Sequence, residues 1–323
     1  MRKTRRLMFE LSKDYLDISF AEVLALVQDE KAEKFENILV TKDSDHRKLA
    51  KRLSMTKAIY DFLFSCDEKN LENCINNFEW NKVISNDFWV RLRHSKRYKE
   101  ADIADMIWDK LKKPKASIKS LNQIVLIFVK NKVFCGKLLA EPVRDYNTRK
   151  PHMRPEHSPT SLPPKIARAM INLTGIKKGA IIDPFCGVGG ILIENGLMGL
   201  TGVGYEIDEK TFHKCRKNLE HYKIKYFHLH NEDSLKLAKD FDYVVTDLPY
   251  GRSSKLFQDR EELYENFLRL LDAHLRKKAV VMYPSDSKFR EKIRKYNLIL
   301  ENEFSIYVHR TLTRKIAVIS RRR

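Results

Sequence analysis

The sequence predicts an α/β protein in which a Rossmann-like, mostly parallel seven-stranded sheet follows an α+β N-terminal region. Strand-like and helix-like runs alternate from residue 164 to the end of the sequence, which is typical of a parallel sheet covered on both faces. A proline-dense segment separates this half from the first. With 323 residues, 43% of them hydrophobic, the chain is long enough for two domains with apolar cores.

Residues 1–140 are expected to form the first domain. Its clearest helix is predicted just before residue 111, because Ile103, Met106, Ile107 and Leu111 fall on one helical face. Its clearest strands are rich in Ile and Val. In order, the predicted elements are a helix over 20–27, a strand over 88–93, a helix over about 99–111, and strands over 122–129 and 132–139.

Residues 141–163 contain closely spaced prolines, which oppose regular helix and sheet and indicate a linker between domains. Residues 164–323 are expected to form the second domain. Its strands are predicted near 180–183, 202–206, 225–230, 242–246 and 278–283, with a C-terminal antiparallel hairpin near 300–309 and 314–320. Its helices are predicted near 164–173, 188–198, 208–221, 260–275 and 286–296.

The composition points to a polyanionic partner. The chain carries 62 Lys and Arg against 43 Asp and Glu, a formal net charge of +19. Residues 1–150 hold 31 basic and 22 acidic residues and the remainder holds 31 and 21, so both halves share the excess. Such a field attracts nucleic acid through counterion release, although a surface charged only for solubility would give the same count.

The sequence lacks three features, and their absence indicates the cellular compartment that we expect. No run reaches the ~18 to 20 apolar residues that cross a bilayer, and the basic N-terminus lacks the apolar run and cleavage site of a signal peptide. The five cysteines are scattered and include no C-x-x-C pair, which is typical of a reducing compartment and disfavours a zinc cluster. We therefore expect a cytoplasmic protein with no membrane segment and no metal site.

A cofactor site is predicted where the first strand of the second domain ends. Asp183-Pro184-Phe185-Cys186-Gly187-Val188-Gly189-Gly190 joins that strand to a helix through glycines, which allow a ligand to approach the backbone. Glu206 ends the next strand, where a doubly wound fold holds ribose hydroxyls, and Asp233-Ser234 follows the third strand. Glu206 and Asp233 could instead be helix N-caps, and their spacing does not separate a nicotinamide cofactor from S-adenosylmethionine.

A catalytic site is predicted at the end of the fourth strand, in Asp247-Leu248-Pro249-Tyr250. An amino group on an aromatic base is a poor nucleophile, because its lone pair is delocalised into the ring. Asp247 and the Leu248 carbonyl could accept its two hydrogen bonds, Pro249 would hold Leu248 extended, and Tyr250 would stack on the base. The bland alternative is a loop with an ordinary solvated Asp. A nicotinamide-dependent oxidoreductase has no need of this segment.

The glycine loop, joined to Asp247-Leu248-Pro249-Tyr250-Gly251-Arg252-Ser253, resembles the archaeal-type tRNA (guanosine-10 N2)-methyltransferases. In that family a THUMP RNA-binding domain precedes a class I methyltransferase domain. The resemblance is specific over residues 150–253, looser over 88–140 and faint over 1–80. Residues 149–168 resemble the family's cofactor lid, but its usual His-Pro-Gly appears as Ser158-Pro159-Thr160.

The resemblance implies that the cofactor is S-adenosyl-L-methionine. It assigns the methionine end to Asp183 and the glycine backbone, the ribose to Glu206, the adenine to Asp233, and the guanine to Asp247 and Tyr250. The predicted cofactor-binding residues are thus Asp183, Phe185, Gly187, Gly189, Glu206, Asp233 and Ser234.

RNA binding is predicted in the first domain, where basic and aromatic residues gather within nine positions. Such a cluster could hold the phosphates of a folded RNA, although alone it would equally describe a solvated loop. The predicted RNA-binding residues are Arg91, Arg93, Lys96, Arg97 and Lys99.

Together these features predict S-adenosylmethionine-dependent methylation of the N2 amino group of a guanosine in tRNA, at guanosine-10, with one or two transfers. An alternative is an amino-group methyltransferase for another tRNA position or for adenine N6 in RNA or DNA. A non-catalytic RNA-binding protein is a further alternative, disfavoured by the intact Asp247, Pro249 and Tyr250. The expected partner is tRNA, a small zinc-binding activator protein is an additional candidate, and the chain alone is expected to be a monomer.

Overall fold

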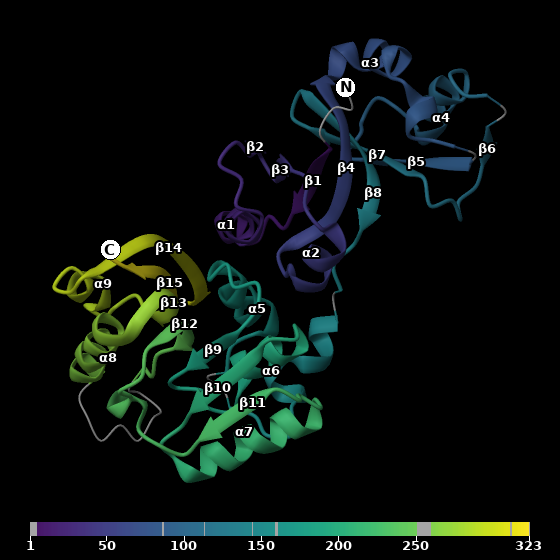
Figure 1. Cartoon of the computed structure of the whole chain (residues 1–323). Helices are drawn as coiled ribbons and strands as arrows, with labels where there is room; N and C mark the ends of the chain where they lie inside the picture. The colour runs from purple at the N-terminus through teal and green to yellow at the C-terminus, as the bar shows by residue number, and fades with distance from the viewer. Residues whose placement is uncertain are drawn as a thin grey trace. The chain divides into compact units, whose positions relative to one another are not determined.

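The computed structural model describes residues 5–85, 87–112, 114–143, 145–158, 161–250, 260–310 and 312–322. The chain divides into two compact units, whose elements are labelled in Figure 1. The first unit comprises Met1–Lys13, Asp29–Ala50 and Thr56–Pro142. The second comprises Asp14–Gln28, Lys51–Met55 and Val143–Arg323, so two short segments from the N-terminal region belong to the C-terminal unit.

The first unit contains a mixed eight-stranded sheet in the order β2-β3-β1-β4-β8-β7-β5-β6. Its strands are β1 (Arg6–Leu11), β2 (Glu33–Phe35), β3 (Ile38–Lys42), β4 (Thr56–Asp67), β5 (Asp87–Arg93), β6 (Lys115–Ala116), β7 (Gln123–Val129) and β8 (Lys132–Ala140). Its helices include α2 (His46–Arg52), α3 (Leu71–Asn77) and α4 (Glu100–Trp108). The stripe predicted on α4 is confirmed, since Ile103 and Ile107 are fully buried against β5 and β7 residues in one core cluster.

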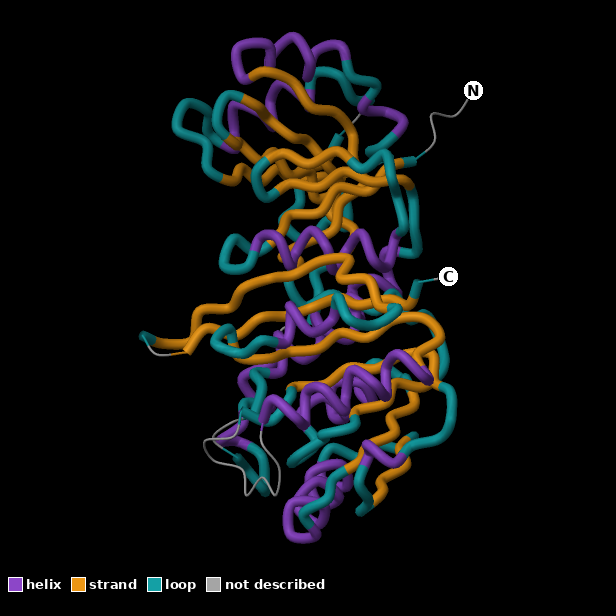
Figure 2. Tube along the Cα trace, turned by 90° about the vertical axis from the view of Figure 1, so that its left-hand side faces the viewer, coloured by secondary structure: helices purple, strands orange, loops and turns teal. Residues whose placement is uncertain are grey.

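The second unit contains a seven-stranded sheet in the order β11-β10-β9-β12-β13-β15-β14. The strands are β9 (Ala180–Asp183), β10 (Thr201–Tyr205), β11 (Phe227–His230), β12 (Phe241–Asp247), β13 (Leu275–Pro284), β14 (Leu298–His309) and β15 (Leu312–Arg321). The first five pair in parallel, whereas β15 runs antiparallel to both β13 and β14. Figure 2 shows β14 and β15 as the long C-terminal pair, so the predicted sheet and its closing hairpin are confirmed.

Helices cover both faces of this sheet (Figure 1). They are α1 (Leu16–Val27), α5 (Pro164–Leu173), α6 (Gly190–Leu197), α7 (Glu209–His221), α8 (Arg260–His274) and α9 (Phe289–Ile293). Successive strand residues point to opposite faces. Val244 therefore packs with α8 and α9, whereas its neighbour Val245 packs with α1 and α5. None of the helices among the described residues is both long and apolar enough to span a membrane.

Helix α1 belongs to the second unit, although its place in the sequence predicts that it is part of the N-terminal domain. The reason is a buried carboxylate, since Glu22 is 0% exposed. It accepts hydrogen bonds from the Ser54 backbone N–H and hydroxyl (both 2.8 Å), from the Met55 N–H (2.9 Å) and from the Asn172 amide of α5 (2.8 Å). These bonds fix α1 and residues 51–55 to α5.

The proline-dense segment is packed into the second unit rather than extended. It forms two short 3-10 helices, η3 (Asp145–Arg149) and η4 (Pro151–Met153). The guanidinium of Arg149 is buried because Glu194 of α6 accepts from its Nε (2.8 Å) and Nη2 (3.3 Å). Arg168 donates to the same carboxylate (2.9 Å), so the segment is anchored to the helix that follows the glycine loop. Pro159 and Thr160 of the lid motif lie outside the described residues.

Candidate active site

Three of the four predicted acids lie together at one edge of the second sheet. Asp183 ends β9, Glu206 follows β10 directly, and Asp247 ends β12. The parallel register pairs Asp183 with Gly204 and Val244 with Ile182, and the carboxyl ends of parallel strands meet at the same edge. Asp233 follows β11 at this edge, two residues farther from its strand.

Asp183 is buried beneath the site. It accepts hydrogen bonds from the Thr246 hydroxyl (2.7 Å) and from the Phe185 backbone N–H (3.3 Å). Burial raises the pKa of its carboxyl to about 7 against the effect of these two bonds, and the nearby charges of Asp247 and Glu206 raise it further. A cationic ligand group beside Asp183 would stabilise the ionised form, so this position fits the positive end of a cofactor.

The glycine loop is held by Glu206. The Glu206 carboxylate accepts from the Gly187 N–H (3.1 Å) and from the Asp208 N–H (2.9 Å), and burial raises its pKa. A carboxylate has about four acceptor positions, so two bonds leave capacity for ribose hydroxyls. Glu206 is therefore not itself a helix N-cap; Asp208 caps α7 through the Thr211 N–H.

Two glycines shape the space beside this loop. Gly187 has φ +52°, and a Cβ built on it would meet no atom within 4 Å, so the backbone there faces open space. Gly189 has φ +87°, and a Cβ there would lie 2.8 Å from the Cys215 sulfur of α7. The loop is thus closed on one side and open on the other, as a backbone that receives a ligand must be.

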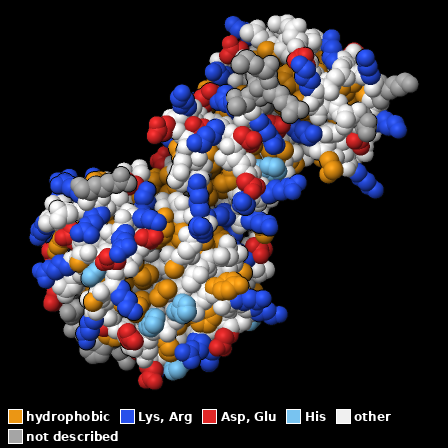
Figure 3. Space-filling view, viewed as in Figure 1, with side chains coloured by type: hydrophobic (Ala, Val, Ile, Leu, Met, Phe, Trp, Pro, Cys, Tyr) orange, Lys and Arg blue, Asp and Glu red, His pale blue; other side chains and the backbone are white. Residues whose placement is uncertain are grey.

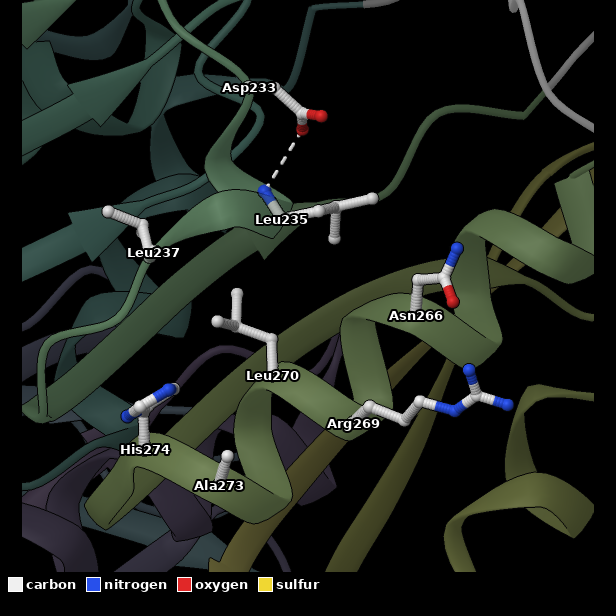
Figure 4. Close-up of a pocket in the computed structure, with 8 residues that line it drawn as sticks. All are labelled: Asp233, Leu235, Leu237, Asn266, Arg269, Leu270, Ala273 and His274. Atoms are coloured by element: carbon white, nitrogen blue, oxygen red, sulfur yellow. Dashed lines mark hydrogen bonds between the residues drawn. The ribbon is translucent and has the colours of Figure 1, made fainter.

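Asp233 caps a short helix and lines a cavity. Its carboxylate accepts from the Leu235 N–H (3.0 Å) at the start of η5 (Ser234–Lys236), and Ser234 is buried beside it. The cavity is shallow, with a volume of about 380 Å³. Figure 4 shows Leu235 of η5 and the following Leu237 on one side and residues of α8 on the other. Asp233 therefore has the N-cap role that the sequence left open.

The predicted catalytic segment is linked internally by a side-chain hydrogen bond. The Tyr250 hydroxyl donates to Asp247 Oδ1 at 2.6 Å, and 19% of the Asp247 side chain is exposed. Burial raises the pKa of Asp247 to about 6, although Arg314 and the Tyr250 hydrogen bond lower it. Burial also raises the pKa of Tyr250, which keeps its hydroxyl a donor. The backbone is fixed because the Tyr264 hydroxyl donates to the Pro249 carbonyl (2.8 Å).

Leu248 and Phe185 are held by the core as well as by the site. The Leu248 N–H donates to the Met282 carbonyl (2.9 Å), which continues the pairing of β12 with β13. The Phe185 ring packs edge-on against Phe267 of α8, with centroids 5.7 Å apart. Gly251, Arg252 and Ser253 of the family motif lie outside the described residues.

Arg314 also lies at the site, although the sequence does not predict it there. It is the third residue of β15. Its Nη1 lies 3.6 Å from Asp247 Oδ2, and its guanidinium lies 5.1 Å over the Tyr250 ring. Its Nε has no hydrogen-bond partner within the described part of the chain. No local signal distinguishes this arginine from the many other basic residues in the sequence. Only the antiparallel pairing of Pro284 with Arg314 brings it to the catalytic edge.

The predicted RNA-binding cluster lies in the first unit, at β5 and the turn before α4. Arg91 stacks over the Trp89 ring (4.7 Å) and Arg97 over the Tyr98 ring (5.1 Å), and both stay largely exposed, as do Lys96 and Lys99. Arg93 differs, because it pairs with the buried carboxylate of Glu10. Figure 3 shows Lys and Arg spread over the visible face rather than gathered in one patch.

Comparisons with known proteins agree with this fold and site. A family model described as an RMKL-like methyltransferase domain matches residues 151–315, and one described as a DNA methylase matches residues 2–217. The crystal structure of TrmN from Thermus thermophilus aligns with a TM-score of 0.52 and 16% identity, covering 98% of this chain and 99% of that one. The fold and the strand-end site thus define an RMKL-like methyltransferase.

Two sequence relatives give the family more narrowly. The tRNA (guanine(10)-N2)-dimethyltransferase of Methanothermobacter thermautotrophicus is 32% identical over 290 residues, which cover 84% of each chain. That of Pyrococcus abyssi is 30% identical over 332 residues, covering 95% of this chain and 97% of the relative. The chain belongs to the tRNA (guanine(10)-N2)-dimethyltransferase family, and the family predicted from the two motifs is confirmed.

Proposed function

We propose that this enzyme methylates the exocyclic N2 amino group of guanosine 10 in tRNA, with S-adenosylmethionine as the methyl donor. The observation that carries this proposal is the pairing of Asp247 with Tyr250, in which the tyrosine hydroxyl donates to Asp247 Oδ1 at 2.6 Å. The pair brings an acceptor carboxylate and an aromatic ring together. The family membership supports the tRNA substrate and the position.

The cofactor fits the donor set at the strand ends. We assign the methionine end to Asp183, to the open backbone at Gly187 and to Gly189, the ribose to Glu206, and the adenine to Asp233 and Ser234. S-adenosylmethionine, when bound, supplies a methyl group on a positively charged sulfur. The buried carboxyl of Asp183 suits this cationic molecule, because an adjacent positive charge lowers its raised pKa.

Asp247 acts on the amine. Its Oδ1 accepts from the Tyr250 hydroxyl, and we propose that an N2–H of guanine takes over this bond while the Tyr250 ring stacks on the base. The second N–H is assigned to the Leu248 carbonyl. As the new carbon–nitrogen bond forms, the bond between the methyl group and the donor sulfur breaks and its electron pair stays on sulfur, which leaves a neutral thioether. N2 loses one proton, which Asp247 accepts and later releases to water.

The match to the family model described as a DNA methylase makes adenine a second candidate substrate. The same amino-group chemistry serves adenine N6, and a model of that description matches residues 2–217. That match ends before β12, so it does not include Asp247 or Tyr250. The Pyrococcus abyssi relative covers 95% of this chain, which includes them, and this supports guanine over adenine.

The first unit is proposed to bind the tRNA. We retain the assignment of a THUMP-like domain within residues 1–140, a connecting segment over 141–163 and a catalytic domain over 164–323. Residues 14–28, residues 51–55 and most of the connecting segment pack with the catalytic domain. Arg91, Lys96, Arg97 and Lys99 are the proposed phosphate contacts. We propose a cytoplasmic monomer, with a small zinc-binding activator protein as an additional candidate partner.

The test is to incubate unmodified tRNA transcripts with S-adenosylmethionine labelled in its methyl group, and then to map the labelled nucleoside. We expect N2-methylated guanosine at position 10, with mono- and dimethylated products separated by chromatography. A transcript with adenosine at position 10 is the matched control and should take up no label. Label found in N6-methyladenosine, or at another guanosine, would show that guanosine 10 is not the substrate.

A further inference from the structure

Arg154 is a buried guanidinium that the roles assigned above do not use. It lies in the segment before α5 and is 4% exposed. Its Nε donates to the Arg149 carbonyl (3.2 Å) and its Nη2 to the Leu162 carbonyl (3.4 Å). Its Nη1 has no hydrogen-bond partner within the residues that the structure describes. An unpaired buried donor on a charged group is costly, so a ligand that accepts from Nη1 would be favoured.

The free Nη1 faces the glycine loop. A Cβ built on Gly190 would lie 3.0 Å from it, so the guanidinium is in contact with the first residue of α6. The first N–H groups of a helix have no partner within the helix and carry partial positive charge. Arg154 and the start of α6 therefore place hydrogen-bond donors and positive charge close to each other, an arrangement that favours an anion.

The segment that carries Arg154 is fixed to this loop by one buried amide. Asn218 of α7 donates from Nδ2 to the Glu156 carbonyl (2.7 Å) and to the Val188 carbonyl (2.9 Å), and its Oδ1 accepts from the Glu156 N–H (3.0 Å). Lys217 adds an ion pair with Glu156 (3.0 Å). Arg154 is thus held against the loop in advance of binding, so little order would have to be gained there.

We propose that Arg154 binds the α-carboxylate of the methionine moiety of S-adenosylmethionine through Nη1. This assignment rests on the proposed function and adds a residue to it. The amino-acid end of that cofactor is a zwitterion, and the loop offers matching charges: the Arg154 guanidinium for the carboxylate and the buried Asp183 carboxyl, at the other end of the loop, for the cationic part. A doubly charged phosphate would fit worse, because Asp183 and Glu206 would repel it.

The test compares two ligands by isothermal titration calorimetry. S-adenosylhomocysteine carries the amino-acid end, whereas 5′-methylthioadenosine has the same nucleoside and thioether without it. Arg154→Gln should lower the affinity for S-adenosylhomocysteine by about tenfold to a hundredfold, the range of a charge-assisted hydrogen bond. It should change the affinity for methylthioadenosine by less than about twofold. Arg154→Lys should recover part of the loss. Lys150→Gln, which removes one exposed charge from the same segment, should change neither affinity.

Each other outcome has a distinct meaning. Equal weakening of both ligands would make Arg154 a residue that only positions the loop, and unchanged binding of S-adenosylhomocysteine would show that it makes no contact. A wild-type protein that binds neither ligand would overturn the proposed function itself. If Arg154→Gln does not fold, the assignment can be tested with the wild-type protein. Decarboxylated S-adenosylhomocysteine should bind the wild type with an affinity at least about tenfold lower than that of the intact ligand. Equal affinities would refute the assignment.

Discussion

At Asp247, burial and charge act in opposite directions on one carboxyl group. Burial raises its pKa to about 6, while the guanidinium of Arg314 and the hydroxyl of Tyr250 favour the ionised form. The acid therefore stays mostly ionised at neutral pH while it remains basic enough to receive a proton. The Tyr250 hydroxyl donates to Oδ1 of Asp247, so this carboxylate has a hydrogen-bond partner within its own segment.

Removing the carboxylate tests its role directly. We expect Asp247→Ala to lower the rate of methyl transfer by at least about a hundredfold, because the amine loses its acceptor. The affinity for tRNA should stay nearly unchanged, since Asp247 is no phosphate contact. Single-turnover kinetics and filter binding measure the two effects. Loss of both tRNA binding and cofactor binding in this variant would contradict the assignment.

The pH dependence of the rate tests Arg314. Below its pKa, Asp247 is protonated and cannot accept from the amine, so the single-turnover rate should rise with pH through a midpoint near 6. Arg314→Met removes the charge that lowers this pKa and should move the midpoint to higher pH by roughly one unit. Arg290→Met removes an exposed arginine from the same unit and serves as the control. Coincident profiles for the Arg314 variant and the wild type would exclude this influence.

At the scale of single elements, the glycine loop combines two separate constraints. Gly187 faces open space, whereas Gly189 has a left-handed backbone in close contact with α7. The same element therefore depends on α7 for its shape and on Glu206 for its anchoring. Its conformation is determined by the surrounding unit and not only by the glycines in its sequence.

A matched pair of substitutions separates backbone strain from contact. Gly189→Ala puts a Cβ at positive φ and 2.8 Å from the Cys215 sulfur, whereas Gly199→Ala puts one at φ +76° with no atom within 4 Å. Both should lose ~1 to 3 kcal/mol of unfolding free energy, with the larger loss at Gly189. Only Gly189→Ala should weaken S-adenosylhomocysteine binding, by about tenfold or more.

Urea unfolding and calorimetry measure these effects. Adding Cys215→Ala to Gly189→Ala removes the contacting sulfur and should recover the difference in stability between the two glycine variants. Equal losses at both positions, with ligand binding intact, would show that the contact with α7 has no influence on the loop.

At the scale of the whole molecule, the order of the chain and the order of the structure differ. Helix α1 and residues 51–55 come from the N-terminal region, yet they pack in the second unit. Ile18 and Met55 belong to the same core cluster as Ile166 and Met170 of α5. The catalytic unit is therefore assembled from three separate stretches of sequence.

Glu22 is the residue on which this assembly should depend most. Glu22→Ala leaves two backbone N–H groups, the Ser54 hydroxyl and the Asn172 amide without their acceptor, and should cost about 3 kcal/mol of unfolding free energy. Asp17→Ala, at an exposed position in the first turn of the same helix, should cost less than about 1 kcal/mol. Equal thermal unfolding midpoints for the two variants would contradict the role of Glu22.

The sequence predicts those features of this structure that depend on local patterns, and it does not predict those that depend on contacts between distant segments. The strands and helices after residue 164 are predicted closely, because alternation of buried strands with amphipathic helices is a local pattern. The acids at the strand ends are found for the same reason. Arg314 and Arg154 are not found, because each reaches the site through packing between distant segments, and a basic residue among many basic residues carries no local mark. The sequence also does not predict the unit in which α1 packs, since an amphipathic pattern shows that a helix has a buried face but not what that face contacts.

The interleaving of α1 with the catalytic unit limits how such a protein could be recombined. A crossover at the proline-dense segment would transfer the seven-stranded sheet and its glycine loop without α1, the helix that packs on α5. The recombined protein would then expose an apolar face of α5, and the Asn172 amide would lack its Glu22 acceptor. Exchange of the RNA-binding part as a cassette would need to spare residues 14–28 and 51–55. The two structural units are therefore not interchangeable as two continuous halves of the sequence.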